Sequence, residues 1–240
     1  MTAHFAIPAT TFVLKAIIEA RLKKAYGPFP PPPVSIAPPP RPPAAPPAAG
    51  AVAPEAPGLT LYMHHAGANP AWRNMYDPHV DGQGKRVSRA PLVLDLHYLL
   101  AAHGGDLERE TVLGVGMSAL NRNGIVPRPM IASILGAIVP PPLPANLMEM
   151  LTKEPLADPL SQPESITISQ APVDIDMSTK LWSALQAPIR PSAYYLVTTV
   201  FLDSEDEFAP PVLVDSLAVA LRPVADPLAD PALDDKLVVP

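Results

Sequence analysis

The chain has 240 residues, a length that allows one domain with additions or two small domains. It holds 36 prolines and no cysteine, and 48% of its residues are hydrophobic; it can therefore bury a core, which excludes full disorder, and it cannot form disulfides, thiolate metal sites or a cysteine nucleophile. Residues 201–240 carry nine acidic and two basic residues of a chain whose net charge is −6, so no basic surface for nucleic acid is expected.

The first predicted element is a helix over Pro8–Ala25. Apolar residues recur through it at helical spacing, a proline lies near its first turn, and Thr10 and Thr11 are candidate caps. Gly27 and Pro28 then predict its end. Basic residues follow its apolar positions instead of preceding them, and no apolar stretch reaches about 18 residues. We therefore expect neither a secretory signal nor a spanning helix, and a cytoplasmic origin.

Three proline-rich stretches divide the sequence. Residues 28–57 hold 14 prolines, residues 140–163 hold seven, and further prolines follow Phe208. The first stretch predicts extended polyproline II chain, with a short strand at Val34–Ala37. Such stretches are either loops and linkers or arms laid across neighbouring subunits.

The segments between these stretches predict strands and helices. In chain order these are a strand at Leu59–His65, a strand at Leu92–Leu100, a helix opened by Asp106 and followed by Gly124, a helix at Met130–Ala137, a strand at Ser165–Gln170, a helix capped by Asp176 and ended by Pro188, and a strand at Ala193–Leu202. This order predicts an α/β (α+β) fold in which helices flank a mixed β-sheet.

Two of these elements predict where the core lies. In the helix after Asp106, Leu113, Met117 and Leu120 recur on one face, which we expect to be buried. The strand Ala193–Leu202 is apolar on both faces, as expected of a central strand that helices cover on both sides.

Histidines and aspartates are the first candidates for catalysis or metal binding. His64 and His65 are adjacent in a predicted strand, so their rings should point to opposite faces and cannot share a metal ion without a bulge. Asp95 and His97 share a face. A structural hydrogen bond fits this pair better than a catalytic dyad, because no serine or second ligand stands beside it at motif spacing.

The glycine-containing segments do not match nucleotide-binding motifs. Gly114 and Gly116 lack a preceding strand and a third glycine, which favours close helix packing instead. The segment Asp81–Arg86 lacks the Gly-Lys-Ser/Thr ending of a phosphate loop and is predicted to be a turn. Asp174 and Asp176 are expected to cap a helix start. The sequence therefore predicts no metal, no cofactor and no enzyme signature.

Four segments, taken in order, resemble one known family. They are Asn69–Asn74, Pro91–Leu100, Leu113–Leu120 and Leu181–Pro188. Their order and separations are similar to those of the cap, or tube-terminator, family of extracellular contractile injection systems, which are phage-tail-like particles. The resemblance covers Ala6 to about Asp203 and depends on the combination of the Leu-Asp-Leu-His-Tyr strand with the Trp-Ser-Ala-Leu helix.

This resemblance implies a structural protein without enzyme activity. Residues 1–203 would form a tail-terminator-like domain with proline-rich insertions, and residues 204–240 an extended acidic arm. Family members form a ring, typically hexameric, on the last ring of the inner tube and join the outermost sheath ring. The implied partners are other copies of the chain, the inner tube protein and the sheath protein, with no nucleic acid and no membrane insertion.

Individual residues can be assigned roles within this interpretation. The interface candidates are Asn69, Trp72, Arg73 and Asn74 in a loop, and Val212, Leu213 and Val214 in the segment Pro211–Val219, which is suited to pair as an added strand with a neighbour's sheet. The structural candidates are Asp95, His97, Tyr98, Trp182 and Leu185. We expect Trp182 to pack in the core, whereas Trp72 fits loop packing and an interface anchor equally well. Asn69 and Asn74 are expected to hydrogen-bond their own loop backbone.

Two other classes of function stay open at this point. One is a small hydrolase that uses Asp95 and His97 with a residue from a loop. The other is a monomeric adaptor whose polyproline runs bind SH3-like or WW-like grooves. Under the leading hypothesis the protein assembles in the cytoplasm, within a phage-tail-like particle.

Overall fold

A single five-stranded sheet organises the domain. The computed structural model describes residues 5–41, 55–72, 91–139, 151 and 155–202, and the backbone of residues 217–220 and 236–239. The helices are α1 (Ala6–Tyr26), α2 (Glu108–Arg122), α3 (Arg128–Gly136) and α4 (Ile175–Leu185). The strands are β1 (Val34–Ser35), β2 (Gly58–Ala68), β3 (Leu92–His103), β4 (Thr167–Gln170), β5 (Ser192–Leu202), β6 (Leu217–Ala220) and β7 (Lys236–Val239).

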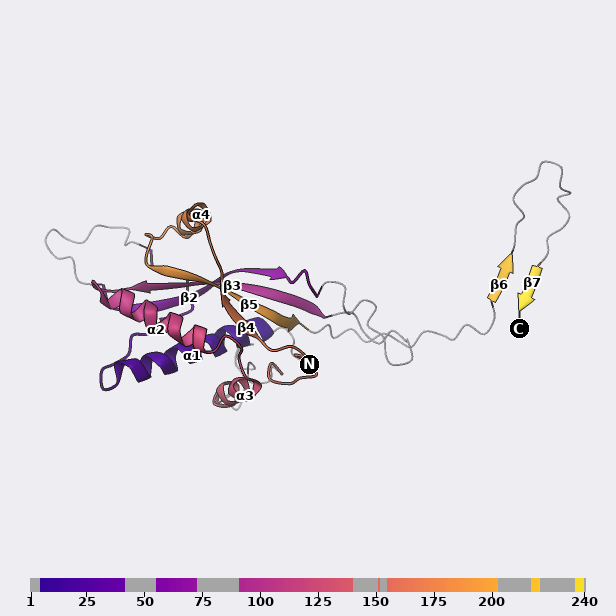
Figure 1. Ribbon diagram of the computed structural model, residues 1–240, viewed down its shortest axis with the longest axis horizontal. Coiled ribbons are helices and arrows are strands. Elements are labelled where there is room, and N and C mark those ends of the chain that lie inside the picture. The colour runs from indigo at the N-terminus through magenta and orange to yellow at the C-terminus, as the bar shows by residue number, and fades with distance from the viewer. Residues whose placement is uncertain are drawn as a thin grey trace.

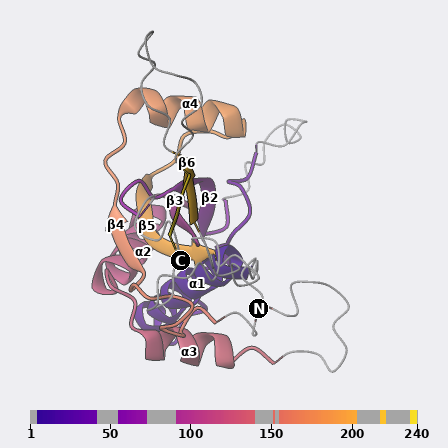
Figure 2. The ribbon, with the colours of Figure 1, turned by 90° about the vertical axis from the view of Figure 1, so that its right-hand side faces the viewer.

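The sheet is mixed and lies between two layers of helices. Its strand order is β1-β2-β3-β5-β4; β1 and β2 are parallel, and the other neighbouring pairs are antiparallel. Helices α1, α2 and α3 pack against one face, and α4 lies on the other (Figures 1 and 2). This arrangement confirms the predicted fold class, and β5 is an interior strand, next to the central β3.

The strands β6 and β7 pair with each other in an antiparallel two-stranded sheet, with Leu217 opposite Val239. The segment predicted to add a strand to a neighbour's sheet, Pro211–Val219, overlaps β6. Its residues Val212, Leu213 and Val214 lie outside the described residues, and the part of that segment in β6 is paired within its own chain.

Helix α1 buries a long apolar face but does not begin where the sequence suggested. The hydroxyl of Thr10 donates to the carbonyl oxygen of Ala6 at 2.7 Å, as a threonine inside a helix does. The predicted capping by Thr10 or Thr11 is therefore wrong, because the helix starts at Ala6 and both residues lie in its second turn. Gly27 ends the helix as predicted, with φ +56° and its N–H bonded to the carbonyl of Lys23.

The buried face of α2 is rotated from the predicted one. Its buried residues are Val112, Gly116, Ala119 and Leu120, whereas Leu113 and Met117 are only partly buried at the margin of the core. A Cβ at Gly116 would lie 2.8 Å from a methyl carbon of Leu59. The small residues thus let the α2 backbone lie close to the sheet, and this contact decides which face is buried.

Helix α4 is capped by Asp174. Its carboxylate accepts the N–H of Met177 at 2.7 Å, while Asp176 lies in the first turn and pairs with Lys180 on the exposed face. Of the two aspartates expected to cap this helix start, Asp174 does so and Asp176 does not. The helix ends at Gln186, which is left-handed at φ +54°, two residues before Pro188.

Two β-bulges interrupt the sheet. The pairing of β2 with β3 shifts between Met63 and His65, so His64 is an extra residue. The pairing of β3 with β5 shifts at Thr199, which has φ +60°. The buried Gln162 side chain supports this second bulge, because its amide donates to the Thr199 carbonyl and accepts the N–H of Phe201.

The described ends of the first proline-rich stretch lie on the domain. The N–H of Leu59 donates to the carbonyl of Pro33 at 3.0 Å, and Nε of Arg41 donates to the carbonyl of Leu185 at the end of α4 at 3.2 Å. At the other end, Arg190 pairs with Glu55 at 2.6 Å. These ends are therefore part of the domain surface, not a free linker.

The two glycines of α2 give a matched test of this packing. Nothing lies within 4 Å of a Cβ at Gly114, whereas Gly116 has Leu59 and Leu100 within 3.3 Å. We predict that Gly114→Ala raises the free energy of unfolding by about 0.5–1 kcal/mol through helix propensity. Gly116→Ala should lower it by about 1 kcal/mol, because overpacking outweighs that gain. Urea denaturation measures both, and equal effects would contradict the proposed contact.

Candidate functional site

The loop that follows β2 is fixed by one asparagine. Asn69 is 9% exposed, and its Oδ1 accepts the N–H groups of Ala71 at 2.9 Å and Trp72 at 3.3 Å. Its Nδ2 donates to Oδ1 of Asp95 at 2.8 Å, and its own N–H donates to the carbonyl of Val93. The predicted bonds of Asn69 to its own loop are thus present, and they are joined to β3 by Asp95.

Trp72 packs against the sheet at the end of this loop. Its ring lies edge-on to Phe201 of β5, with ring centres 5.4 Å apart, and the side chain is half-buried. It therefore combines packing against β5 with a partly exposed surface. Arg73 and Asn74 lie outside the described residues.

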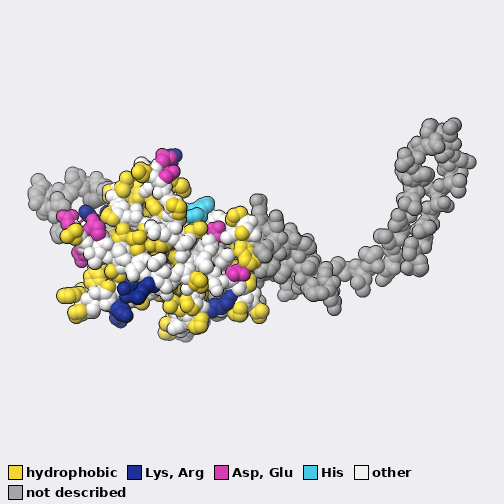
Figure 3. Space-filling model, viewed as in Figure 1, with side chains coloured by type: hydrophobic (Ala, Val, Ile, Leu, Met, Phe, Trp, Pro, Cys, Tyr) yellow, Lys and Arg dark blue, Asp and Glu magenta, His cyan; other side chains and the backbone are white. Residues whose placement is uncertain are grey.

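The bulge in β2 corrects the prediction for the adjacent histidines. It places His65 opposite His97 of β3, and the ring of His97 lies 5.2 Å from that of His65 and 6.0 Å from that of His64. His64 also meets the ring of Tyr194 edge-on. The rings of His64 and His65 therefore both lie beside His97 on the α4 face of the sheet. Histidine side chains reach the surface beside α4 (Figure 3).

Burial and repulsion by neighbouring rings disfavour the charged forms of His64 and His97, which cluster with His65. Burial lowers the pKa of His64, and positive charge on His97 and His65 lowers it further. Burial also lowers the pKa of His97, as does His65, while Asp95 opposes this shift. No set of three metal-ligating side chains in the described part of the chain is placed to hold an ion.

The pairing needed for the hydrolase hypothesis is not formed in the described residues. Oδ1 of Asp95 accepts from Asn69, and no hydrogen bond joins Asp95 to His97 or His97 to a hydroxyl group. The structural hydrogen bond predicted between Asp95 and His97 is therefore not formed either, because Asp95 accepts from Asn69 and so ties the loop to the sheet.

The remaining structural candidates hold the helices to both faces of β3. Tyr98 is fully buried, and its hydroxyl is hydrogen-bonded to that of Thr11 in α1 at 2.8 Å; burial raises its pKa, so it stays a neutral phenol. On the opposite face, Trp182 of α4 is buried with Leu99 and Ala101, and Leu185 packs beside it. Trp182 thus packs in the core as predicted.

Sequence reasoning missed the residues that complete this site. Gly67 leaves room for His65, because a Cβ there would lie 3.1 Å from Nε2 of that ring. Ser178 bonds the hydroxyl of Tyr194 at 2.8 Å and so anchors α4 to β5. Gly67 itself was the one available signal, because a glycine inside a strand often marks a bulge or a close contact.

The family model of the Pvc16 N-terminal domain matches residues 9–214. The chain belongs to this family. All four segments that carried the sequence resemblance fall inside the match, so the predicted recognition of the family is confirmed. No curated protein matches the chain.

Two solved structures are similar to this member of the family. One is the sheath/tube terminator of PVC, an extracellular contractile injection system, in the extended state, with 12% identity and a TM-score of 0.47 over 89% of this chain and 63% of that chain. The other is the tube-terminating cap of the anti-feeding prophage, with 14% identity and a TM-score of 0.41 over 86% and 59%. The chain thus spans less than two thirds of either protein. Among the described helices, none is long and apolar enough to cross a membrane.

The bond between Asn69 and Asp95 can be tested by exchanging its two groups. Asn69→Asp sets two carboxylates against each other and should cost about 2 kcal/mol of unfolding free energy at pH 7. The reciprocal double variant Asn69→Asp/Asp95→Asn restores a donor and an acceptor and should recover most of that loss. Thermal and urea unfolding measure both; a double variant as unstable as the single one would contradict the bond.

The histidine cluster predicts a pH dependence of stability. Because the pKa values of His64 and His97 are lowered in the folded chain, the unfolded chain binds more protons below its own pKa of about 6.5. Stability should therefore be complete above that pH and fall as the pH drops toward 5. The variant His64→Gln/His97→Gln should flatten this slope, leaving the contribution of His103, whose pKa burial also lowers. An unchanged slope would contradict the cluster's role.

Proposed function

We propose that this chain is the cap of a contractile injection system. In this role it forms a ring, with six copies as the expected number, on the distal end of the inner tube. It ends tube growth and anchors the terminal sheath ring. The match to the Pvc16 N-terminal domain family over residues 9–214 carries the proposal.

The architecture supports a mechanical role. A head-to-tail ring closes only if each subunit presents two different, complementary surfaces that hold a fixed angle. The sheet ends in two unlike edges, the two-residue parallel β1 and the antiparallel β4. Tyr98 and Trp182 fix helices to both of its faces, which makes the domain between those edges rigid.

The proposed partners follow from this role. They are other copies of the chain, the inner tube protein and the sheath protein, and the function needs neither an enzyme activity nor a cofactor. The loop fixed by Asn69, with Trp72, Arg73 and Asn74, is the candidate contact with these partners, together with Val212, Leu213 and Val214. Assembly takes place in the cytoplasm, within a phage-tail-like particle.

Omission of the chain from assembling particles tests this function. Without it, we predict tubes of uncontrolled length whose distal sheath ring detaches, because nothing stops addition of tube rings. Adding back the intact chain should restore a single tube length, measured by electron microscopy of many particles. Tubes of normal, uniform length in its absence would contradict a terminating role.

The loop provides a finer version of this test. Trp72→Ala removes the partly exposed ring that packs on Phe201, and we expect weaker capping with the domain still folded. Exposed Leu160, at 91% exposure, gives the control Leu160→Ala, which should cap normally. Equal capping by both variants would show that Trp72 is not part of the interface.

A further inference from the structure

The outer edge of β4 is only half covered. Near its start, the N–H of Val126 donates to the carbonyl of Ile166 at 2.9 Å, and the N–H of Ile168 donates to the carbonyl of Gly124 at 2.7 Å. Backbone groups alternate between the two sides of a strand. The N–H and C=O of Gln170 therefore also point outward, and within the described residues no bond is formed to them.

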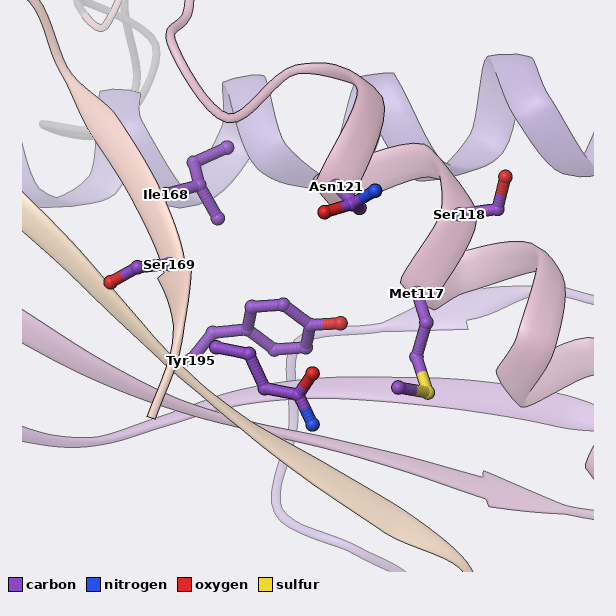
Figure 4. Close-up of a pocket in the computed structure, with 7 residues that line it drawn as sticks. Met117, Ser118, Asn121, Ile168, Ser169 and Tyr195 are labelled. Carbon is purple, nitrogen blue, oxygen red and sulfur yellow. The ribbon is translucent and has the colours of Figure 1, made fainter. Parts of the chain in front are cut away.

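A groove lies beside this open part of the edge. It has a volume of about 520 Å³ and is lined by Met117, Ser118 and Asn121 of α2, Ile168, Ser169 and Gln170 of β4, and Tyr195 of β5 (Figure 4). The groove is on the face of the sheet that α2 covers. None of these lining residues is charged.

One polar side chain of β5 reaches into the groove. Tyr195 is 4% exposed, and its hydroxyl extends across the groove toward α2 (Figure 4). Among the described residues it has no hydrogen-bond partner, and neither do the side chains of Ser118, Asn121 and Gln170; these groups are open to solvent and available to a ligand. The polar groups that line the groove are uncharged and open to solvent, so the groove is suited to an uncharged ligand that forms hydrogen bonds. Beside an open strand edge, an extended peptide has that chemistry.

The opposite edge of the same sheet supplies such a peptide. In β1, the carbonyl of Pro33 accepts the N–H of Leu59, so Pro33 and Ser35 face β2, and Val34 and Ile36 present their backbone groups outward. The side chain of Val34 is buried on the face that α1, α2 and α3 cover. Ile36, the residue after β1, is 54% exposed. If the alternation of β1 continues through it, its side chain points to the same face as that of Val34.

Strand directions allow the two edges to meet. From β1 to β4 the sheet contains one parallel and three antiparallel pairs, so β1 and β4 run in opposite directions. A second copy in the same orientation would therefore place its β1 antiparallel to β4 of the first copy. The faces that α1, α2 and α3 cover would then lie on the same side in both copies. In that arrangement Ile36 would point toward the groove.

We propose that the groove at β4 binds the β1 edge of a second copy of this chain. Val34–Ile36 of one copy extends the sheet at Gln170 of the next, and the Ile36 side chain enters the groove over Tyr195. The proposal rests on the proposed ring and goes beyond it by assigning the two surfaces that join neighbouring subunits.

Proline substitutions at the two edges test the backbone contacts. Gln170→Pro and Ile36→Pro each remove one outward N–H without removing a bond to the neighbouring strand of the same copy. Each should weaken self-association about tenfold, measured by native mass spectrometry and light scattering of the intact chain. The controls Gln170→Ala and Ile36→Ala keep the N–H, and circular dichroism verifies the fold. Equal association of the proline and alanine variants would overturn the proposal.

Cysteine cross-linking tests the same contact independently of affinity, since the chain has no cysteine of its own. We expect Ile36→Cys mixed with Gln170→Cys to form an intermolecular disulfide under mild oxidation with diamide, and the double variant to give a ladder of higher species. Leu160→Cys, at a position 91% exposed, serves as the control and should not cross-link to Ile36→Cys. Absence of the Ile36–Gln170 cross-link overturns the proposal. If particles still carry a ring, the cap function then stands with other subunit contacts.

Discussion

The domain depends on the burial of both faces of β3. Alternate side chains of this strand face opposite layers: Tyr98 reaches Thr11 of α1, and the next residue, Leu99, packs with Trp182 of α4. Every other strand of the sheet is placed through β3, either directly, as β2 and β5 are, or one strand further out, as β1 and β4 are. A single rigid strand therefore fixes the distance and angle between the two edges of the sheet.

That rigidity suits the domain to the proposed ring. Closure of a ring requires each subunit to repeat the same angle between its two contact surfaces. The interior strands are locked by buried contacts, whereas both edge strands are short, with two residues in β1 and four in β4. Short edges limit unwanted pairing with other sheets. They are also compatible with a specific contact that adds only a few hydrogen bonds and one buried side chain.

Much of the fold could be predicted from local patterns. The alternation in Leu92–Leu100 identified β3, and the apolar run in Ala193–Leu202 identified β5 as an interior strand, because burial on both faces leaves a strong signal. The family was recognised from four short segments whose spacing spans both layers. Trp182 could be assigned to the core because large aromatic residues are scarce in this chain.

The errors arose where tertiary packing overrides a local pattern. The buried face of α2 is set by the close contact of Gly116 with Leu59. The spacing of large apolar residues along the helix cannot reveal a contact that depends on a glycine. The bulge at His64 is invisible to an alternation rule, because one extra residue exchanges the two faces of the strand beyond it. The site formed by Asn69 and Asp95 joins residues from two strands, so neither segment alone could indicate it.

The central claim is that copies of this chain close a ring at one end of a tube. Cryo-electron microscopy of particles carrying a tagged version of the chain tests it most directly. The account predicts one closed ring, with the tag repeated around the axis, at the end of the tube far from the baseplate. Tagged chains found singly, along the length of the tube, or absent from particles whose ends are nevertheless closed would contradict it.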